Sequence, residues 1–209
     1  MRIDPELCWD NLAAILDRAR EFDNFVRFDM EDSSITQATL EMCHRAREYY
    51  PRCGTVLQAS LRRTLEDARG LAGAESNVRI CKGAYVEPEA IAFQEFQEVR
   101  DSFMAVARQL LEQGSYACFA THDLWLIEGC EALVAELGVA PDRYEFQALS
   151  GVPVEATLDQ LLASGHRVRY YIPFGSEWYA YSLRRMRENP AIWRHTLRAM
   201  FSRSRHRRR

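Results

Sequence analysis

Two hydrophobic periods alternate along the chain. Apolar residues recur at helical spacing in long stretches, and short apolar or β-branched runs lie between those stretches. The predicted helices are residues 5–21, 35–50, 62–72, 97–113, 124–137, 154–164, 177–188 and 190–202. The predicted strands are residues 24–31, 55–60, 77–85, 116–122, 143–149 and 167–175. This regular alternation predicts an α/β fold with parallel strands.

Glycines occur at a repeated place in this pattern, shortly before a strand. A helix often ends in a left-handed residue there, so these glycines are expected to be helix caps. They are Gly54, Gly73, Gly114, Gly138 and Gly165. The repetition favours βα units of one kind in a single domain over residues 1–202, followed by a basic, disordered tail over 203–209.

The strand count leaves two architectures open. A (β/α)₈ TIM-like barrel normally needs about 250 residues, and this chain has 209 residues with a helix as its first element. We therefore expect either an open six-stranded sheet or an incomplete barrel. In the second case the chain would supply about six βα units, strands 3–8 of the barrel, plus the C-terminal helices.

Composition narrows the class of protein. The chain is 47% hydrophobic and 27% charged, as in soluble globular proteins. No apolar run approaches the roughly 20 residues of a membrane helix. The six cysteines are widely spaced without a C-x-x-C pair, which favours a reducing compartment. The net charge of −3 becomes about −8 without the arginines of 203–209, and this acidic body argues against nucleic acid as a partner. Lys82 is the only lysine.

Polar residues gather where the predicted strands end. Because ligands of parallel α/β folds bind at the carboxyl ends of the strands, these residues predict a binding site. With the residues among them, these strand ends are Asp29, Met30, Glu31, Asp32, Gln58, Lys82, Gly83, Ala84, Tyr85, Thr121, His122, Asp123, Gln147, Pro173, Phe174 and Gly175. Charged residues also alternate with apolar ones along individual predicted strands. Arg27, Asp29, Arg79 and Glu145 fall on the charged faces, which predicts a buried lattice of paired charges.

A helical stripe near the C-terminus suits a carboxylate. Tyr181, Arg184, Arg185 and Glu188 lie at i, i+3, i+4 and i+7. Two guanidinium groups beside an aromatic ring could bind a small planar carboxylate bidentately. His122 could be a structural residue, a general base or a metal ligand; with no second ligand at suitable spacing, we expect no metal. Motifs for a serine nucleophile, a Rossmann site or a P-loop are absent from the sequence.

Seven motifs in order resemble the catalytic barrel of the proline dehydrogenase family, over about residues 5–202. They are VRFDMEDS, VLQASLRRT, VRICKGAY, FATHD, YEFQALSG, VRYYIPFG and YSLRRMREN. The resemblance implies a distorted (β/α)₈ barrel that binds FAD. It also implies oxidation of L-proline to 1-pyrroline-5-carboxylate, the first step of proline degradation to glutamate, with electrons passing to a membrane quinone.

The resemblance also implies roles for individual residues. Asp29 and Arg79 match catalytic positions, an acid close to the substrate and a cation near the flavin. The flavin-contacting positions are matched by Met30, Gln58, Arg79, Lys82, Gly83, Ala84, Thr121 and His122. The substrate-binding positions are matched by Tyr181, Arg184 and Arg185, which would bind proline's ring and carboxylate, and by Leu149.

Two departures from the family pattern are tolerable, Ser150 for a tyrosine and Cys81 for an aliphatic residue. A third is larger, because the first two barrel strands and a lysine on the second are expected to be missing. A non-catalytic fragment is therefore an alternative, and another barrel enzyme for a small carboxylate is a third. The family also implies a cytoplasmic protein at the inner face of a bacterial membrane, and a separate pyrroline-5-carboxylate dehydrogenase as partner.

Overall fold

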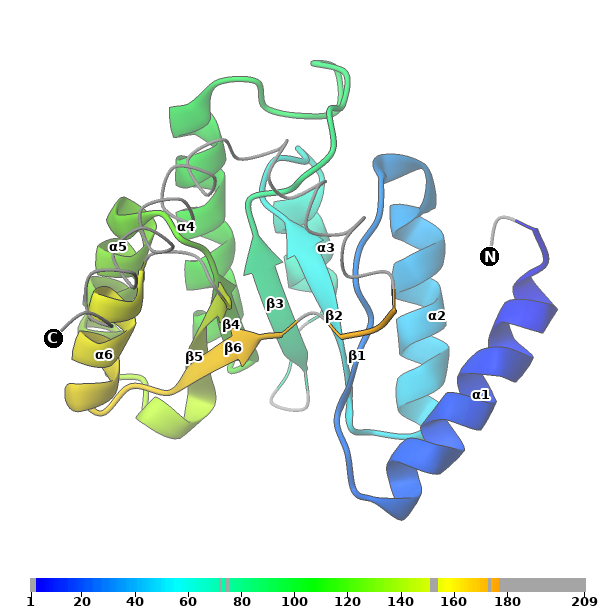
Figure 1. Ribbon diagram of the computed structural model, residues 1–209. Coiled ribbons are helices and arrows are strands. Elements are labelled where there is room, and N and C mark those ends of the chain that lie inside the picture. Colours follow the sequence, from blue (N-terminus) through cyan, green and yellow to red (C-terminus); the bar gives the residue numbers. More distant parts are fainter. Residues whose placement is uncertain (1–2, 72, 74–75, 151–153, 173, 177–209) are drawn as a thin grey trace, which may run out of the picture. The chain divides into compact units, whose positions relative to one another are not determined.

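A computed structural model describes residues 3–71, 73, 76–150, 154–172 and 174–176 (Figure 1). The helices are α1 (Pro5–Glu21), α2 (Thr36–Tyr49), α3 (Thr64–Gly70), α4 (Phe96–Glu112), α5 (Leu124–Glu136) and α6 (Glu155–Ala163), with 3₁₀ turns at Ser33–Ile35 and Pro141–Arg143. The strands are β1 (Val26–Arg27), β2 (Cys53–Gln58), β3 (Asn77–Cys81), β4 (Tyr116–Ala120), β5 (Tyr144–Leu149) and β6 (Val168–Tyr171). The predicted helices at 177–188 and 190–202 lie outside the described residues.

The chain forms two compact units, residues 1–145 and 146–209. In the first unit, β1 pairs with β2, β2 with β3, and β3 with β4, always in parallel. In the second unit, β5 pairs in parallel with β6, from Phe146 opposite Val168 to Leu149 opposite Tyr171. The prediction of a parallel α/β fold is therefore confirmed. These pairings do not amount to a closed eight-stranded barrel.

Five of the six predicted strands end earlier than expected, and those over 55–60, 116–122 and 167–175 end at Gln58, Ala120 and Tyr171. The other two leave loops at the carboxyl edge of the sheet. The strand predicted over 24–31 is only β1, because after Phe28 donates its N–H to Gly54 O (2.8 Å) the chain turns away toward the 3₁₀ helix. The strand predicted over 77–85 ends with β3 at Cys81, and Gly83 has φ +107°, which a β-strand does not accommodate. Beyond Phe28 after the first strand and Lys82 after the second, which still take part in backbone hydrogen bonds to β2 and the residues after it, the chain forms loops at the carboxyl edge of the sheet.

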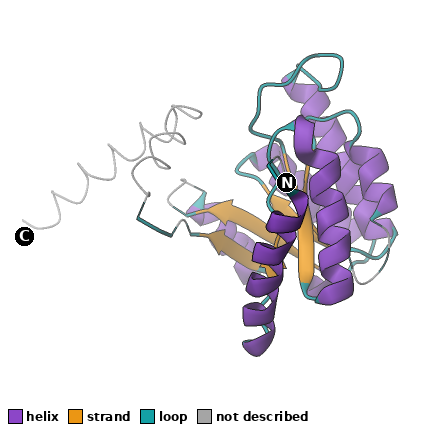
Figure 2. Cartoon of the chain, turned by 90° about the vertical axis from the view of Figure 1, so that its right-hand side faces the viewer, coloured by secondary structure: helices purple, strands orange, loops and turns teal. Residues whose placement is uncertain are grey.

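Helices lie against the strands (Figure 2), and in the first unit the buried side chains between them are largely apolar. Every residue of β2 is buried, and Val78 and Ile80 of β3 are buried on the face between the strands and the helices. Helix α4 contributes Phe103, Val106 and Leu110, none of which is exposed to solvent. Because α4 contacts both β3 and β4, its buried stripe fixes the height of its first turn relative to the strand ends.

The glycine prediction was wrong at one position. Four of the five predicted caps have positive φ, whereas Gly54 lies inside β2 and has no such conformation. At Gly54 the missing side chain provides space, because a Cβ would overlap Asn77 O and lie 2.7 Å from Arg27 Nη1. The residue is glycine because Arg27 crosses over it.

Charged residues on the inner strand faces of this unit are held mainly by neutral polar groups, where paired charges were expected. The Arg27 guanidinium donates to Thr55 O (2.8 Å) and Asn77 O (2.9 Å), and burial lowers the pKa of Arg27. The buried Glu145 carboxylate accepts a hydrogen bond from the Tyr116 hydroxyl (3.1 Å). Each charge removed from water thus has polar partners, as the cost of burying a charge requires.

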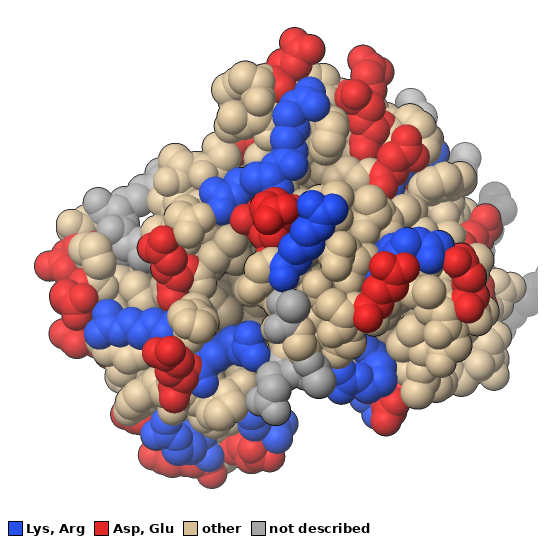
Figure 3. All heavy atoms as spheres, turned by 180° about the vertical axis from the view of Figure 1, so that it is seen from behind, with Lys and Arg blue, Asp and Glu red and all other residues tan. Residues whose placement is uncertain are grey.

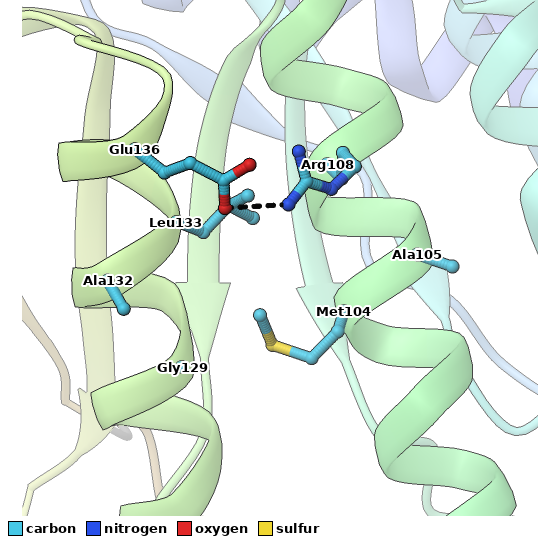
Figure 4. A pocket seen from close by; sticks show the side chains of 7 residues that line it. All are labelled: Met104, Ala105, Arg108, Gly129, Ala132, Leu133 and Glu136. Carbon is cyan, nitrogen blue, oxygen red and sulfur yellow. Dashed lines mark hydrogen bonds and ion pairs between the residues drawn. The ribbon is translucent and has the colours of Figure 1, made fainter.

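A groove of about 380 Å³ separates α4 from α5 (Figure 4). It lies where Gly129 faces Met104, and an ion pair between Arg108 and Glu136 (2.8 Å) crosses one end of it. Elsewhere on the surface, acidic and basic side chains are interspersed (Figure 3). Within the described residues, no helix is long and apolar enough to span a bilayer.

Candidate active site

The centre of the candidate site is an ion pair between a residue of β3 and a residue just after β1. Arg79 Nη1 lies 2.6 Å from Asp29 Oδ1, although 50 residues separate the two in the chain. The Arg79 side chain is 16% exposed, whereas that of Asp29 is 54% exposed. A half-exposed pair of this kind contributes at most about 1 kcal/mol to folding. Its value therefore lies in presenting a fixed cation beside a solvent-accessible carboxylate.

Gln58 connects the end of β2 to the loop after β1. Its Nε2 donates to Glu31 O (2.8 Å), and its side chain is buried. The Tyr85 hydroxyl donates to the Glu31 carboxylate from the loop after β3. In the same place Glu87 accepts hydrogen bonds from the backbone N–H and hydroxyl of Ser33, both at 2.7 Å. The loops after β1 and β3 are thus fastened together above β2.

Lys82 is held at the end of β3 by a carboxylate from the loop after β4. Its Nζ lies 3.2 Å from Asp123 Oδ2, and its backbone carbonyl accepts from Ser60 N–H (2.8 Å). Asp123 is only 6% exposed and also receives two hydrogen bonds from Arg100 of α4. Burial works to raise the pKa of Asp123, but the bonds from Arg100 and Lys82 outweigh it and the pKa is lowered. Asp123 is therefore ionised at neutral pH.

Thr121 and His122 occupy the end of β4. The buried Thr121 hydroxyl accepts from the Asp123 backbone N–H (3.1 Å), which shapes the turn into α5. Burial lowers the pKa of His122, and the nearby Lys82 charge lowers it further. The imidazole is consequently neutral at pH 7, as a hydrogen-bonding group toward a ligand would be.

Gly83 presents exposed backbone without a side chain at the same edge of the sheet. A Cβ there would overlap Ser60 Oγ, and its φ of +107° disfavours any side chain. Ala84 beside it is exposed, while Met30 is buried after β1. Burial raises the pKa of the Cys81 thiol to about 11, so Cys81 is protonated and not a nucleophile at neutral pH.

The remaining predicted residues are in the second unit or beyond the described part. Leu149 ends β5, half-buried, opposite Tyr171 of β6. Tyr181, Arg184 and Arg185 lie outside the described residues, so their roles stay predictions. Across the described part, no three His, Cys, Asp or Glu side chains are grouped to hold a metal ion.

Sequence reasoning missed Arg100 and the pair of Ser33 with Glu87, and it placed Glu31 and Tyr85 at the strand ends without predicting their contact. Arg100 stands in a predicted amphipathic helix 23 residues before Asp123, and nothing in the local pattern connects them. For Tyr85 and Glu87 the signal was available, since both follow the K-G-A motif. Their role depends on the loop after β3, which leaves the sheet and contacts the loop after β1.

The arrangement brings a cation, a carboxylate and exposed backbone to one edge of a parallel sheet. The model of the family described as "Proline dehydrogenase" matches residues 2–196. The chain belongs to the proline dehydrogenase family. It is 38% identical over 189 residues to "Proline dehydrogenase 2" of Bacillus subtilis, covering 90% of this chain and 62% of that protein. It is 37% identical over 182 residues to "Proline dehydrogenase" of Deinococcus radiodurans, covering 86% of this chain and 58% of that protein.

Solved structures agree with this family. Proline utilization A from Bdellovibrio bacteriovorus, inactivated by N-propargylglycine, superposes with a TM-score of 0.78 at 28% identity. The match covers 87% of this chain and 22% of that protein. The chain spans less than two thirds of the length of the curated proline dehydrogenases given above. It thus shares the family's α/β fold over most of its own length.

Proposed function

We propose that this chain is a FAD-dependent proline dehydrogenase that oxidises L-proline to 1-pyrroline-5-carboxylate, the first step of proline degradation to glutamate. The observation that carries the proposal is the ion pair of Arg79 with Asp29, two positions that the family motifs mark as catalytic. The family match over residues 2–196 supports it.

The residues at the strand ends fit a flavin. Gly83 is exposed and has no side chain, so a flat ligand can approach its backbone closely from the solvent side, while Ser60 packs where a Cβ would lie. Arg79 and Lys82 supply positive charge, and Gln58 and Thr121 supply polar groups from buried positions. Met30, Ala84 and His122 complete the set proposed to hold FAD.

Bound FAD would accept a hydride from proline, which no protein side chain can do. The chain's own contribution is electrostatic and positional. A guanidinium at Arg79 stabilises negative charge that develops on a neighbouring ligand, and Asp29 keeps that guanidinium in place. The exposed Asp29 carboxylate is also available to the secondary ammonium of proline.

We propose that substrate recognition comes from residues beyond the strand ends. Arg184 and Arg185 would bind the carboxylate through paired hydrogen bonds, and Tyr181 and Leu149 would contact the apolar ring. We further propose that electrons pass to a membrane quinone at the inner face of a bacterial membrane, and that a separate pyrroline-5-carboxylate dehydrogenase takes the product.

The first experiment is a flavin titration of the 209-residue chain, followed by reduction of a dye acceptor with L-proline. We expect a yellow protein with a protein-bound flavin spectrum and proline-dependent dye reduction. A protein that binds no FAD would contradict the proposal and favour the non-catalytic fragment. Turnover of a small carboxylate without flavin would favour another barrel enzyme.

The second experiment replaces Arg185. Arg185→Met should raise KM for L-proline at least tenfold, since a bidentate charged hydrogen bond contributes about 1.5–3 kcal/mol. The midpoint of thermal unfolding should change little, which separates substrate binding from folding. Arg108→Met, which removes an ion pair between α4 and α5, is the control and should leave KM as it is. An unchanged KM in Arg185→Met would remove that residue from the site.

A further inference from the structure

Lys82 does not hold its own position. The lysine side chain is long and flexible, and an ammonium group acts at a defined point only if something fixes it. In this structure the fixing group is Asp123, whose Oδ2 lies 3.2 Å from Nζ. The position of the Lys82 ammonium group therefore depends on what holds Asp123.

The Asp123 carboxylate is held from its other side by Arg100. Arg100 Nε donates to Oδ2 (2.9 Å) and Nη2 donates to Oδ1 (2.7 Å), so two roughly parallel hydrogen bonds engage both oxygens. This fork fixes the plane of the carboxylate, which a single bond cannot do. One oxygen, Oδ2, is shared between Arg100 and Lys82.

Aromatic rings constrain the two cations further. Lys82 Nζ lies 4.7 Å and Arg100 Cζ 4.4 Å from the centre of the Phe96 ring, one turn before Arg100 on α4. Trp125 of α5 lies 5.1 Å from Arg100 Cζ. Contacts of cations with ring faces at these distances are attractive. The first turns of α4 and α5 therefore enclose the carboxylate together with its two partners.

We propose that Arg100 is a positioning residue, which orients the Asp123 carboxylate and through it sets the location of the Lys82 ammonium group. The link to flavin binding rests on the proposed function, whereas the link from Arg100 to Lys82 rests on geometry alone. Arg100 differs in this from Arg108, two turns further along α4. Arg108 pairs with Glu136 where both side chains are largely exposed, 41% and 59%, far less enclosed than Asp123 at 6%.

The sequence provides a direct probe of Lys82. Because Lys82 is the only lysine, reductive methylation with ¹³C-formaldehyde gives one lysine NMR signal, which differs in chemical shift from the amino terminus. In Arg100→Met we expect this signal to shift and broaden, because the carboxylate can then rotate. Arg100→Gln keeps a hydrogen-bond donor without the charged fork and should give an intermediate shift, and it leaves Lys82 as the only lysine. Arg108→Met is the matched control and should leave the signal where it is.

A double-mutant cycle on FAD affinity tests the second link. Arg100→Met should weaken FAD binding about tenfold in the otherwise unchanged chain. In a Lys82→Met background it should have no further effect, since the residue through which it acts is gone. A merely structural Arg100 would weaken binding by the same factor in both backgrounds.

The outcomes separate the two proposals. An unmoved lysine signal in folded Arg100→Met or Arg100→Gln would overturn the positioning role, as would additive effects in the cycle. A chain that binds no FAD, or binds it equally well as Lys82→Met, would count against the proposed flavin site. In that case the lysine signal alone would still decide whether Arg100 positions Lys82.

Discussion

Single residues at the strand ends combine unusual backbone with unusual electrostatics. Gly83 has φ +107° and no room for a side chain, while the neutral His122 lies near the cationic Lys82. Neither feature is expected from folding alone, because a positive φ restricts the position to glycine and partial burial beside a cation opposes protonation of the imidazole. Features of this kind gather where a ligand is handled.

Gly83→Ala should lower the free energy of unfolding by about 1–3 kcal/mol and also weaken FAD binding. The backbone strain comes with an overlap between the new methyl group and Ser60. Urea unfolding and a flavin titration measure the two effects. The matched control is Gly73→Ala, whose φ of +117° is similar but where a Cβ has open space. Equal losses of FAD affinity in both variants would show that only global stability matters.

His122 should make stability depend on pH in a defined direction. Its pKa in the folded chain lies below the ordinary 6.5, from burial first and Lys82 second. The unfolded chain therefore takes up a proton at higher pH than the folded chain does. The stability contributed by the neutral imidazole is complete above about pH 6.5 and is lost as pH falls through the lowered pKa.

His122→Gln should thus lose less stability than the unchanged chain between pH 7.5 and 5.5, measured by urea unfolding at each pH. Lys82→Met should show a smaller pH effect as well, since it removes one of the two causes of the lowered pKa. Identical pH dependence in all three chains would contradict the environment described for His122.

At the level of elements, the bounds of the helices could be predicted more closely than those of the strands. Helices α1, α2, α4, α5 and α6 begin and end within a residue of their predicted bounds, because apolar periodicity reports directly which face is buried. The strand predicted over 24–31 shrank to two residues, because its alternating pattern continues through a loop. Period-two patterns cannot distinguish a paired strand from extended chain that only lies beside one.

The packing of β1 on β2 leaves no space for a side chain at Gly54. Gly54→Ala should cost about 1–3 kcal/mol, as overpacking in a tight interior does. The new Cβ would overlap the backbone carbonyl of Asn77, which cannot rotate away, and would press on Arg27. Gly70→Ala at the end of α3 meets nothing within 4 Å and should be neutral or slightly stabilising. Comparable denaturant midpoints for the two variants would contradict the role given to Gly54.

For the whole molecule, the sequence predicted the parallel α/β class and the family. The resemblance assigned Arg79 and Asp29 to one site, but their contact was seen only in the structure. It could not predict that Asp123 joins Arg100 to Lys82, because such long-range pairs depend on how α4 sits on the sheet. Local patterns report burial and turn chemistry, whereas partner choice among many arginines is decided by tertiary packing.

The fastening between the loops after β1 and β3 limits how the protein could be re-engineered. Glu31 with Tyr85 and Ser33 with Glu87 are pairs in which each loop supplies one member. A loop taken alone from a relative would bring one half of each pair and leave the other half without its match. Loop exchanges aimed at new substrates should therefore transfer residues 29–33 and 83–87 together from the same relative.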